Sequence, residues 1–266
     1  MLASGIIKSK DSKYKTFKDI EKRIISLSDS NIAVSEGMRE MMQEIYPQIN
    51  VSYIPICVDT KQSDNSNEDK NEIIKTLGIK QSKVIAYCGS LSTNFNNNIY
   101  LYIKYMKFII SNYKDVHFLI ITQSDIQKIM SESNIKKENY SICEASGPKL
   151  FSLLSSCDAG IFIMDPGQDR KTRLGIKFVE YLSAGIPVIV NSNVGSATKI
   201  VKEKGFGIIL DLDNLVNDSK ILISFLTNQK PDKSILKNYA YENFDTHKVS
   251  NEYLKLYEET LKNARE

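Results

Sequence analysis

From residue 83 onward, short apolar runs alternate with stretches of helical periodicity. The apolar runs span residues 84–88, 116–121, 140–143, 159–164, 187–190 and 207–210. Helices are expected near 98–113, 124–131, 148–155, 176–184 and 196–204, where apolar residues recur every three or four positions. Continuous apolar strands separated by helices are typical of a parallel sheet buried on both faces. The pattern therefore predicts an α/β fold: a doubly wound, six-stranded, mostly parallel, Rossmann-like sheet with five crossovers.

The flanking segments divide the chain into four predicted parts. Residues 1–50 suggest helix, strand and helix, with the first helical pattern starting at Phe17, a strand near 31–34, and Ser35 as the N-cap of the second helix. Residues 51–72 suggest an extended connector followed by a polar loop and linker over 59–72. The alternating region, 73–245, is predicted to be one nucleotide-binding domain, and 246–266 a C-terminal helix.

Composition narrows the classes of function. The 35 basic residues nearly balance the 32 acidic ones, which does not suggest a nucleic-acid binder. Four cysteines without a C-x-x-C pair, together with only two histidines, argue against a zinc site. Without a signal peptide or an apolar stretch of about 18 residues, we expect a cytoplasmic protein. The basic run from Lys8 to Arg23 is a candidate for peripheral contact with an anionic membrane, or else a solvated helix face.

Candidate chemistry is expected at the point where the strand order of the sheet reverses. In the order 3-2-1-4-5-6, ligands bind outside the carboxyl ends of the first and fourth strands. The loop after the first strand, 89–94, begins with Gly89, which would let a ligand approach the backbone or would simply form a tight turn. It lacks the G-x-G-x-x-G pattern of dinucleotide-binding sites. The loop after the fourth strand, 165–175, leads into a helix that carries Lys177 and Glu180.

The second loop is rich in basic side chains. Arg170, Lys171, Arg173 and Lys177 are expected near a helix N-terminus, where free amides and a partial positive charge favour an anion such as a phosphate. Arg173 can bind phosphate oxygens in a bidentate fork, and Lys177 acts as a point charge. Glu180, one turn further on, could accept hydrogen bonds from a ribose diol. The alternative is a Lys177–Glu180 surface ion pair that contributes little.

The motif Lys-x-x-Glu-Tyr-Leu-x-Ala-Gly-x-Pro-Val-Ile at 177–189 resembles the donor-site signature of glycogen-synthase-like glycosyltransferases, which have the GT-B fold of two facing Rossmann domains. Supporting similarities occur at 32–35, 54–59, 88–91 and 153–160, and the resemblance covers roughly residues 20–262. Residues 1–50 could hold only the last strand and helices of the N-terminal, acceptor-binding domain. The resemblance therefore implies a complete donor domain and a partial acceptor domain.

The resemblance also implies roles for individual residues. Lys177 and Arg173 would stabilise the diphosphate leaving group of a nucleotide-diphospho-sugar, and Glu180 would bind the ribose. The remaining donor-binding residues would be Gly89 and Ser90 beside the phosphates, Ile142, Cys143 and Glu144 beside the base, and Thr172 and Gly175. Thr172 stands where many members have a second Glu that touches the donor sugar. Such enzymes usually need neither a metal nor a cofactor.

The expected function is transfer of a hexose-type sugar, with retention, to a glycan or lipid-linked acceptor in bacterial surface polysaccharide assembly. A separate acceptor-domain subunit is a candidate partner. Two alternatives remain: a truncated, non-catalytic relative that binds nucleotide-sugar or serves as a partner subunit, and a sugar-nucleotide epimerase of similar two-domain shape.

Overall fold

The fold is centred on a parallel sheet. The computed structural model describes residues 11–64, 70–93, 98–165, 168–192, 194–211, 214–228 and 230–263. The strands of the sheet run in the order β5-β4-β3-β6-β7-β8, and every pair is parallel. Counted from β3, this is the order 3-2-1-4-5-6, so the predicted doubly wound sheet is confirmed. The strands are β3 (Lys83–Cys88), β4 (Val116–Ile121), β5 (Tyr140–Cys143), β6 (Ala159–Phe162), β7 (Val188–Asn191) and β8 (Gly207–Leu210).

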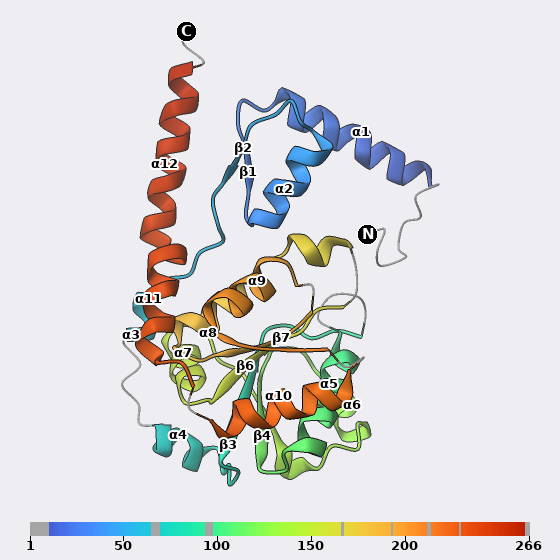
Figure 1. The fold of residues 1–266 in the computed structure, drawn as a ribbon, viewed down its shortest axis with the longest axis vertical. Helices are drawn as coiled ribbons and strands as arrows, with labels where there is room; N and C mark the ends of the chain where they lie inside the picture. The colour runs from blue at the N-terminus through green and yellow to red at the C-terminus, as the bar shows by residue number, and fades with distance from the viewer. Residues whose placement is uncertain are drawn as a thin grey trace.

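Helices cover both faces of this sheet and create two apolar layers (Figure 1). In β3, Val84, Ala86 and Cys88 belong to one layer, whereas Ile85 and Tyr87 belong to the other. This alternation is why the strand is a continuous apolar run. The first layer includes α7 (Gly147–Ser155), α8 (Ile176–Ser183), α9 (Gly195–Lys204) and α11 (Lys233–Phe244), and the second includes α5 (Ile99–Asn112), α6 (Gln127–Glu132) and α10 (Leu215–Thr227).

A smaller lobe lies above the sheet domain. It contains α1 (Ser12–Leu27), β1 (Asn31–Ala33), α2 (Glu36–Ile45) and β2 (Val51–Tyr53), and its two strands pair in parallel. Ser35 is the N-cap of α2 as predicted, since its hydroxyl accepts a hydrogen bond from the Met38 amide at 3.1 Å. The helix α1 begins at Ser12, a full turn before Phe17, because exposed polar residues extend it.

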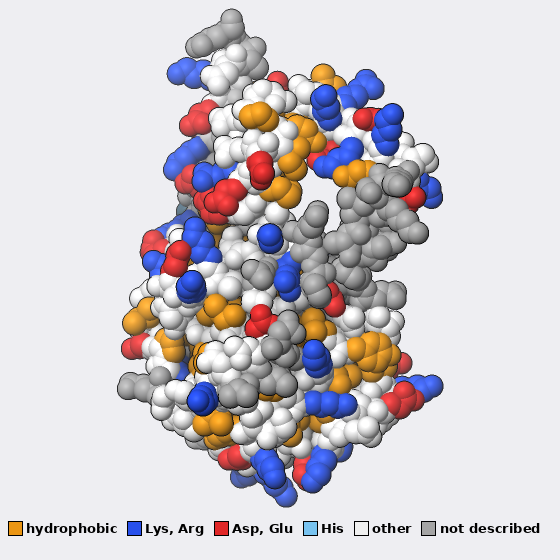
Figure 2. All heavy atoms as spheres, turned by 45° about the vertical axis from the view of Figure 1, so that its right-hand side comes forward, with side chains coloured by type: hydrophobic (Ala, Val, Ile, Leu, Met, Phe, Trp, Pro, Cys, Tyr) orange, Lys and Arg blue, Asp and Glu red, His pale blue; other side chains and the backbone are white. Residues whose placement is uncertain are grey.

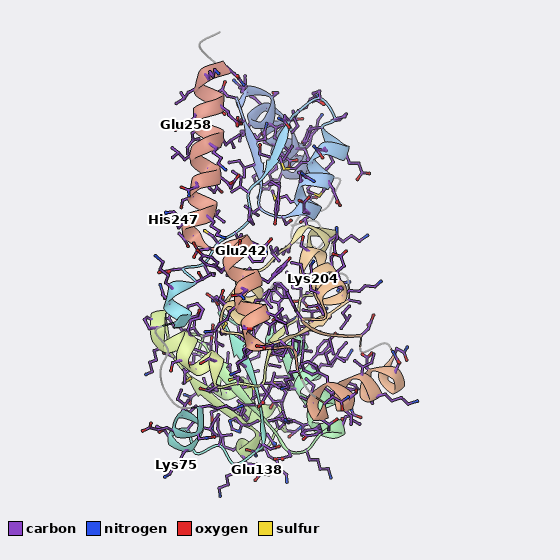
Figure 3. All side chains as sticks on the ribbon, turned by 60° about the vertical axis from the view of Figure 1, so that its left-hand side comes forward. Lys75, Glu138, Lys204, Glu242, His247 and Glu258 are labelled. Carbon is purple, nitrogen blue, oxygen red and sulfur yellow. The ribbon has the colours of Figure 1, made fainter. Side chains whose placement is uncertain are left out.

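The last helix, α12 (Thr246–Asn263), returns along the smaller lobe (Figures 1 and 3). Figure 3 places His247 at its start and Glu258 further along it. The hydroxyls of Ser30 and Thr260 lie 2.5 Å apart, which joins this helix to the turn before β1. The small lobe is therefore built from both ends of the chain.

The two segments that cross between the lobes are bonded to each other. The Val58 amide donates to the Phe244 carbonyl at 2.9 Å, and the Thr246 amide donates to the Val58 carbonyl at 3.0 Å. The Thr60 hydroxyl donates to the buried carboxylate of Asp245 at 2.5 Å. These three hydrogen bonds hold the two crossing segments together, so they are not independent linkers.

The predicted polar loop at 59–72 is partly wrong. Two short helices, α3 (Lys61–Asp64) and α4 (Lys70–Thr76), occupy parts of it, and residues 65–69 lie outside the described part. The Asp59 carboxylate accepts the Lys61 amide at 3.2 Å and so helps to start α3. The boundaries of the four predicted parts stay a prediction. The remaining short helices are η1 (Lys137–Asn139) and η2 (Gln168–Thr172).

Among the described residues, no helix is both long enough and apolar enough to cross a membrane. On the face drawn in Figure 2, basic and acidic side chains are interspersed over both lobes.

Candidate functional site

A cleft of about 480 Å³ opens at the carboxyl ends of β3, β4 and β5. The first turn of α8 forms its other wall, and α8 follows β6, the neighbour of β3 in the sheet. The cleft therefore lies at the predicted reversal of strand order, where open α/β sheets bind ligands. Its lining residues are Cys88, Gly89, Ser90, Ile121, Thr122, Gln123, Ala145, Ser146, Gly147, Leu150, Lys177 and Glu180.

Gly89 lines the cleft beside Lys177. Its φ is +134°, a backbone conformation that side-chain-bearing residues rarely adopt. A Cβ at this position would lie 3.2 Å from Cε of Lys177, so the lysine stem packs directly over the glycine. The glycine amide donates to the Ile121 carbonyl at 3.0 Å. The backbone conformation favours glycine here, and the lysine stem would have to shift slightly to admit a Cβ.

Lys177 and Glu180 form an ion pair within the cleft. The Lys177 Nζ lies 3.0 Å from Oε2 and 3.3 Å from Oε1 of Glu180. The Glu180 side chain is only 13% exposed and that of Lys177 33% exposed. The two residues therefore pair with each other, and both line the cleft. Their roles in binding a diphosphate and a ribose stay predictions.

A thiol provides a second contact to the Glu180 carboxylate. Sγ of Cys88 donates to Oε2 of Glu180 at 3.4 Å. Burial, followed by the negative charge of Glu180, raises the pKa of the Cys88 thiol, so it remains protonated and can act as a donor. The backbone amide of Cys88 also donates to the Tyr181 hydroxyl at 3.0 Å. Adjacent residues of α8 are thus both bonded to the last residue of β3.

Tyr181 fixes α8 against the sheet. The ring is fully buried, and its hydroxyl also donates to the Ile161 carbonyl at 3.3 Å. A Cβ at Gly160 would lie 2.4 Å from Cγ of Tyr181, so only glycine leaves room for the ring. This packing sets the position of Glu180 with respect to β3.

The structure gathers only some of the predicted donor residues at this cleft. Gly89, Ser90, Lys177 and Glu180 line it. Ile142 and Cys143 are half-buried and Glu144 is exposed, and they immediately precede the lining segment 145–147. Their assignment to the base stays a prediction.

Arg173, Thr172 and Gly175 are not among the lining residues. The Thr172 carbonyl accepts a hydrogen bond from the Ser35 hydroxyl of the small lobe. A Cβ at Gly175 would lie 2.2 Å from Cζ of Phe162, which explains this glycine by packing. The structure places Arg170 and Lys171 in η2, on the segment that contacts α2 and α9. Roles of Arg173, Thr172 and Gly175 in donor binding stay predictions.

Sequence reasoning missed two lining segments, 122–123 and 145–147. They follow β4 and β5, so their place at the carboxyl edge of the sheet was the signal that could have found them. Gly147 has φ +56° and begins α7, whose N-terminus adjoins the cleft. Free amides of this first turn add to the positive potential there.

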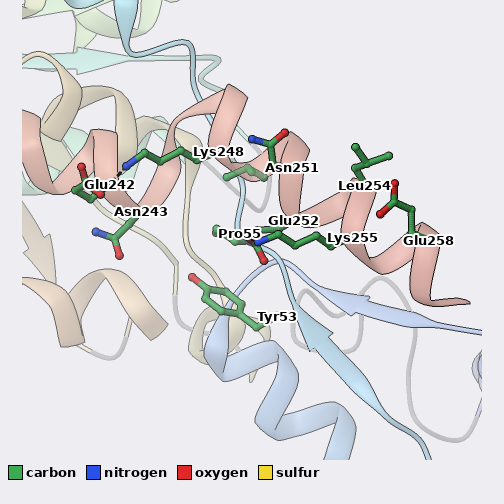
Figure 4. A pocket seen from close by; sticks show the side chains of 11 residues that line it. Tyr53, Pro55, Glu242, Asn243, Lys248, Asn251, Glu252, Leu254, Lys255 and Glu258 are labelled. Carbon is green, nitrogen blue, oxygen red and sulfur yellow. Dashed lines mark hydrogen bonds and ion pairs between the residues drawn. The ribbon is translucent and has the colours of Figure 1, made fainter.

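A second groove of about 590 Å³ lies between α12 and the segment that follows β2 (Figure 4). Four of its five charged side chains pair with each other: Lys248 with Glu242 at 2.5 Å and Lys255 with Glu252 at 2.9 Å. Exposed pairs of this kind contribute little, and they leave few groups directed toward a ligand. In the described part of the chain, no three His, Cys, Asp or Glu side chains are arranged to hold a metal ion.

Comparison with protein families gives one match, over residues 82–224. The matching family is described as glycosyl transferases group 1. The matched region runs from β3 into α10 and contains every residue that lines the cleft. Comparison with curated proteins gives no significant match.

Solved structures share the fold of this chain at low sequence identity. HepE from Anabaena, solved in complex with UDP, has a TM-score of 0.73 and 14% identity over 96% of this chain and 70% of its own. Sucrose-phosphate synthase from Thermosynechococcus elongatus has 0.69 and 13% over 96% and 65%. WaaG, a glycosyltransferase involved in lipopolysaccharide biosynthesis, has 0.63 and 16% over 88% and 62%. The chain therefore spans about two thirds of the length of these structures.

Proposed function

Since the chain belongs to the glycosyl transferases group 1 family, we propose that its cleft binds a nucleotide-diphospho-sugar as the donor for sugar transfer. The single observation that carries this proposal is the Lys177–Glu180 pair of α8, in a cleft that the start of α7 also lines, at the strand-order reversal. A cation beside helix N-termini suits the diphosphate, and a largely buried carboxylate suits the ribose hydroxyls.

The chemistry follows from these two groups. In the transfer, the bond between the sugar's anomeric carbon and the diphosphate oxygen breaks, and its electron pair stays on the diphosphate. An acceptor hydroxyl forms the new bond to that carbon and releases its proton. Lys177, with the amides at the start of α7 and α8, would stabilise the negative charge that develops on the leaving group. We include Arg173 in this role, and the donor requires neither metal nor cofactor in the proposed reaction.

We further propose a hexose as the transferred sugar, retention of configuration, and a glycan or lipid-linked acceptor in bacterial surface polysaccharide assembly, on the cytoplasmic side of the membrane. The family membership and the fold shared with HepE and WaaG support this setting.

The acceptor half of the site is proposed to come from a further α/β domain. Within residues 11–53 the structure describes only two strands, β1 and β2. The same observation supports the second candidate, a nucleotide-sugar-binding subunit that needs a partner for turnover.

Calorimetric titration of the 266-residue chain with UDP, ADP and GDP, and with the matching monophosphates, tests donor binding. We expect the preferred nucleoside diphosphate to bind at least about tenfold more tightly than its monophosphate, since a charge-assisted contact to the second phosphate contributes roughly 1.5–3 kcal/mol. Equal affinities would contradict the assignment of Lys177 to the diphosphate.

A further inference from the structure

The last residue of β3 has a contact that donor binding alone does not explain. We propose that Cys88 is a positioning residue: its thiol holds the Glu180 carboxylate in the orientation that accepts the ribose hydroxyls, an inference that rests on the proposed donor site. Cys88 itself is 1% exposed and lies at the edge of the cleft, next to Gly89.

In the proposed site Lys177 has two anionic partners, the Glu180 carboxylate and the diphosphate. In the structure its ammonium contacts both oxygens of Glu180, at 3.0 and 3.3 Å. A bound diphosphate carries more negative charge than one carboxylate, so it would draw the ammonium away from Glu180. The lysine stem can follow, because it runs over Gly89, where no side chain blocks it.

When Lys177 turns toward the phosphates, the Glu180 carboxylate still has one contact within the protein. The Cys88 thiol then keeps its contact with Glu180, 3.4 Å from Oε2, and leaves Oε1 open to the ligand. The thiol cannot easily move, since its own backbone amide is bonded to the Tyr181 hydroxyl at 3.0 Å. Carboxylate oxygens have several acceptor sites, so Oε2 can accept both the thiol and a ribose hydroxyl.

The contact between the Cys88 thiol and Glu180 should affect binding of the ribose and not of the phosphates. Cys88 touches Glu180, whereas the phosphates are assigned to Lys177 and the loop amides. Loss of the thiol should therefore weaken discrimination between ribose and deoxyribose without weakening the binding of inorganic pyrophosphate. A general loss of folding would lower both.

The experiment measures the affinities of UDP, 2′-deoxy-UDP and pyrophosphate for the wild type and for Cys88→Ala and Cys88→Ser. If another nucleoside diphosphate binds more tightly, it and its 2′-deoxy form replace UDP. In the wild type we expect the deoxy form to bind at least about tenfold more weakly. This ratio should fall about threefold or more in Cys88→Ala and be retained in Cys88→Ser, whose hydroxyl can still donate to Glu180.

Cys157→Ala is the matched control. Its thiol is equally buried but donates to the Leu153 carbonyl at 3.3 Å, and Cys157 is not a lining residue of the cleft. The control should keep the wild-type ratio. A folded Cys88→Ala variant with undiminished discrimination would overturn the positioning role while leaving the donor site intact. Failure of the wild type to bind any nucleoside diphosphate would overturn the proposed function together with this inference.

A spectroscopic readout tests the contact without any nucleotide. The S–H stretching band of Cys88, identified by its loss in Cys88→Ala, should move to higher wavenumber in Glu180→Ala, because a hydrogen-bonded S–H vibrates at lower frequency than a free one. An unmoved band would show that the thiol does not donate to Glu180, whatever the binding data.

Discussion

The Glu180 carboxylate is engaged by an ammonium and a thiol before any ligand is present. We therefore expect the negative charge of this carboxylate, more than its shape, to determine how strongly it binds the ribose hydroxyls. Glu180→Gln should weaken binding of the preferred nucleoside diphosphate by roughly ten- to a hundredfold, since hydrogen bonds to a charged group contribute about 1.5–3 kcal/mol. The change is nearly isosteric, so the fold should survive. Calorimetry with the wild type and the variant measures this loss.

A double cycle of affinities combines the Glu180→Gln substitution with removal of the 2′-hydroxyl from the nucleotide. The 2′-deoxy nucleotide should bind the wild type much more weakly than the parent nucleotide does, but bind Glu180→Gln only slightly more weakly, because one contact cannot be lost twice. Unchanged affinity combined with a lower melting temperature would instead make Glu180 a structural partner of Lys177.

At Gly89, we expect a substitution to change both stability and diphosphate binding. Gly89→Ala should lower the free energy of unfolding by about 1–3 kcal/mol, because φ +134° is strained for alanine. It should also weaken diphosphate binding several-fold, since the new methyl would lie 3.2 Å from Cε of Lys177. Urea denaturation and calorimetry measure the two effects.

Gly78 offers a matched control for that experiment. It also has a positive φ, +66°, but a Cβ there would have nothing within 4 Å. Gly78→Ala should therefore be destabilising and leave diphosphate affinity unchanged. If Gly89→Ala behaved in the same way, the close approach of Lys177 would have no part in binding.

At the scale of elements, one ion cluster joins three segments at the amino end of the sheet. The Asp158 carboxylate, before β6, accepts the Val84 amide at 2.8 Å and contacts Lys230 at 3.5 Å and Lys70 at 3.3 Å. Lys230 also donates to the Asp158 carbonyl at 2.7 Å. Burial lowers the pKa of Lys230 to about 8, and the opposing effect of Asp158 only partly offsets it. We therefore expect the free energy of unfolding to vary with pH in the alkaline range.

The direction of that dependence follows from proton linkage. Between about pH 8 and the ordinary lysine value of 10.5, the unfolded chain binds a proton at Lys230 that the folded chain has released. Stability from this group therefore rises with pH through that window. The difference in free energy of unfolding between wild type and Lys230→Met should grow as pH rises from 8 toward 10, as urea denaturation can measure. Lys75→Met, at an exposed position of α4, is the control, and a flat difference for Lys230→Met would contradict the expectation.

Elements differed in how well the sequence predicted them. The four inner strands, β4, β3, β6 and β7, were predictable because nearly every residue in them is buried and most are apolar. The edge strands β5 and β8 are only partly buried. The helices α3 and α4 were not, since α4 buries only Ile73 and the surrounding polar residues resemble a loop. A helix that covers the core with one side chain leaves too weak a periodic signal.

In the candidate site, too, some contacts were predictable from the sequence and others were not. Lys177 and Glu180 were predictable as a pair because they lie three residues apart on one helix. The Cys88–Glu180 contact spans 92 residues and depends on how α8 packs over β3. Arg173 was assigned by its closeness in sequence, and its role stays a prediction, since it is not among the residues that line the cleft.

At the scale of the whole molecule, the small lobe presents an apolar stripe to solvent. Four side chains of α1 are about half or more exposed: Phe17, Ile20, Ile24 and Leu27. Figure 2 shows hydrophobic side chains gathered on this lobe beside basic ones. Exposed apolar side chains that gather on one face are typical of surfaces that contact another protein or a membrane.

We expect the 266-residue chain alone to transfer sugar at no appreciable rate, because an acceptor that is not held beside the donor gains nothing from proximity. Mass spectrometry of products from several nucleotide-sugars with glycan and lipid-linked acceptors measures this. Robust transfer by the purified chain would refute the expectation, and a rate that rises with the square of protein concentration would then indicate a site completed by two copies.

The small lobe, built from both ends of the chain, also sets an order of events on the ribosome. The Ser30 hydroxyl meets its partner on Thr260 only after 230 further residues have been synthesised. At roughly 5–20 residues per second this is a wait on the order of 10 to 50 s. The nascent β1–β2 unit passes that interval with the surface that will receive α12 uncovered, whereas the six-stranded sheet is complete at residue 210. A pause in translation just after residue 210 would therefore leave all six strands synthesised while the small lobe is unfinished, and chaperones that act on nascent chains should be found on residues 12–53.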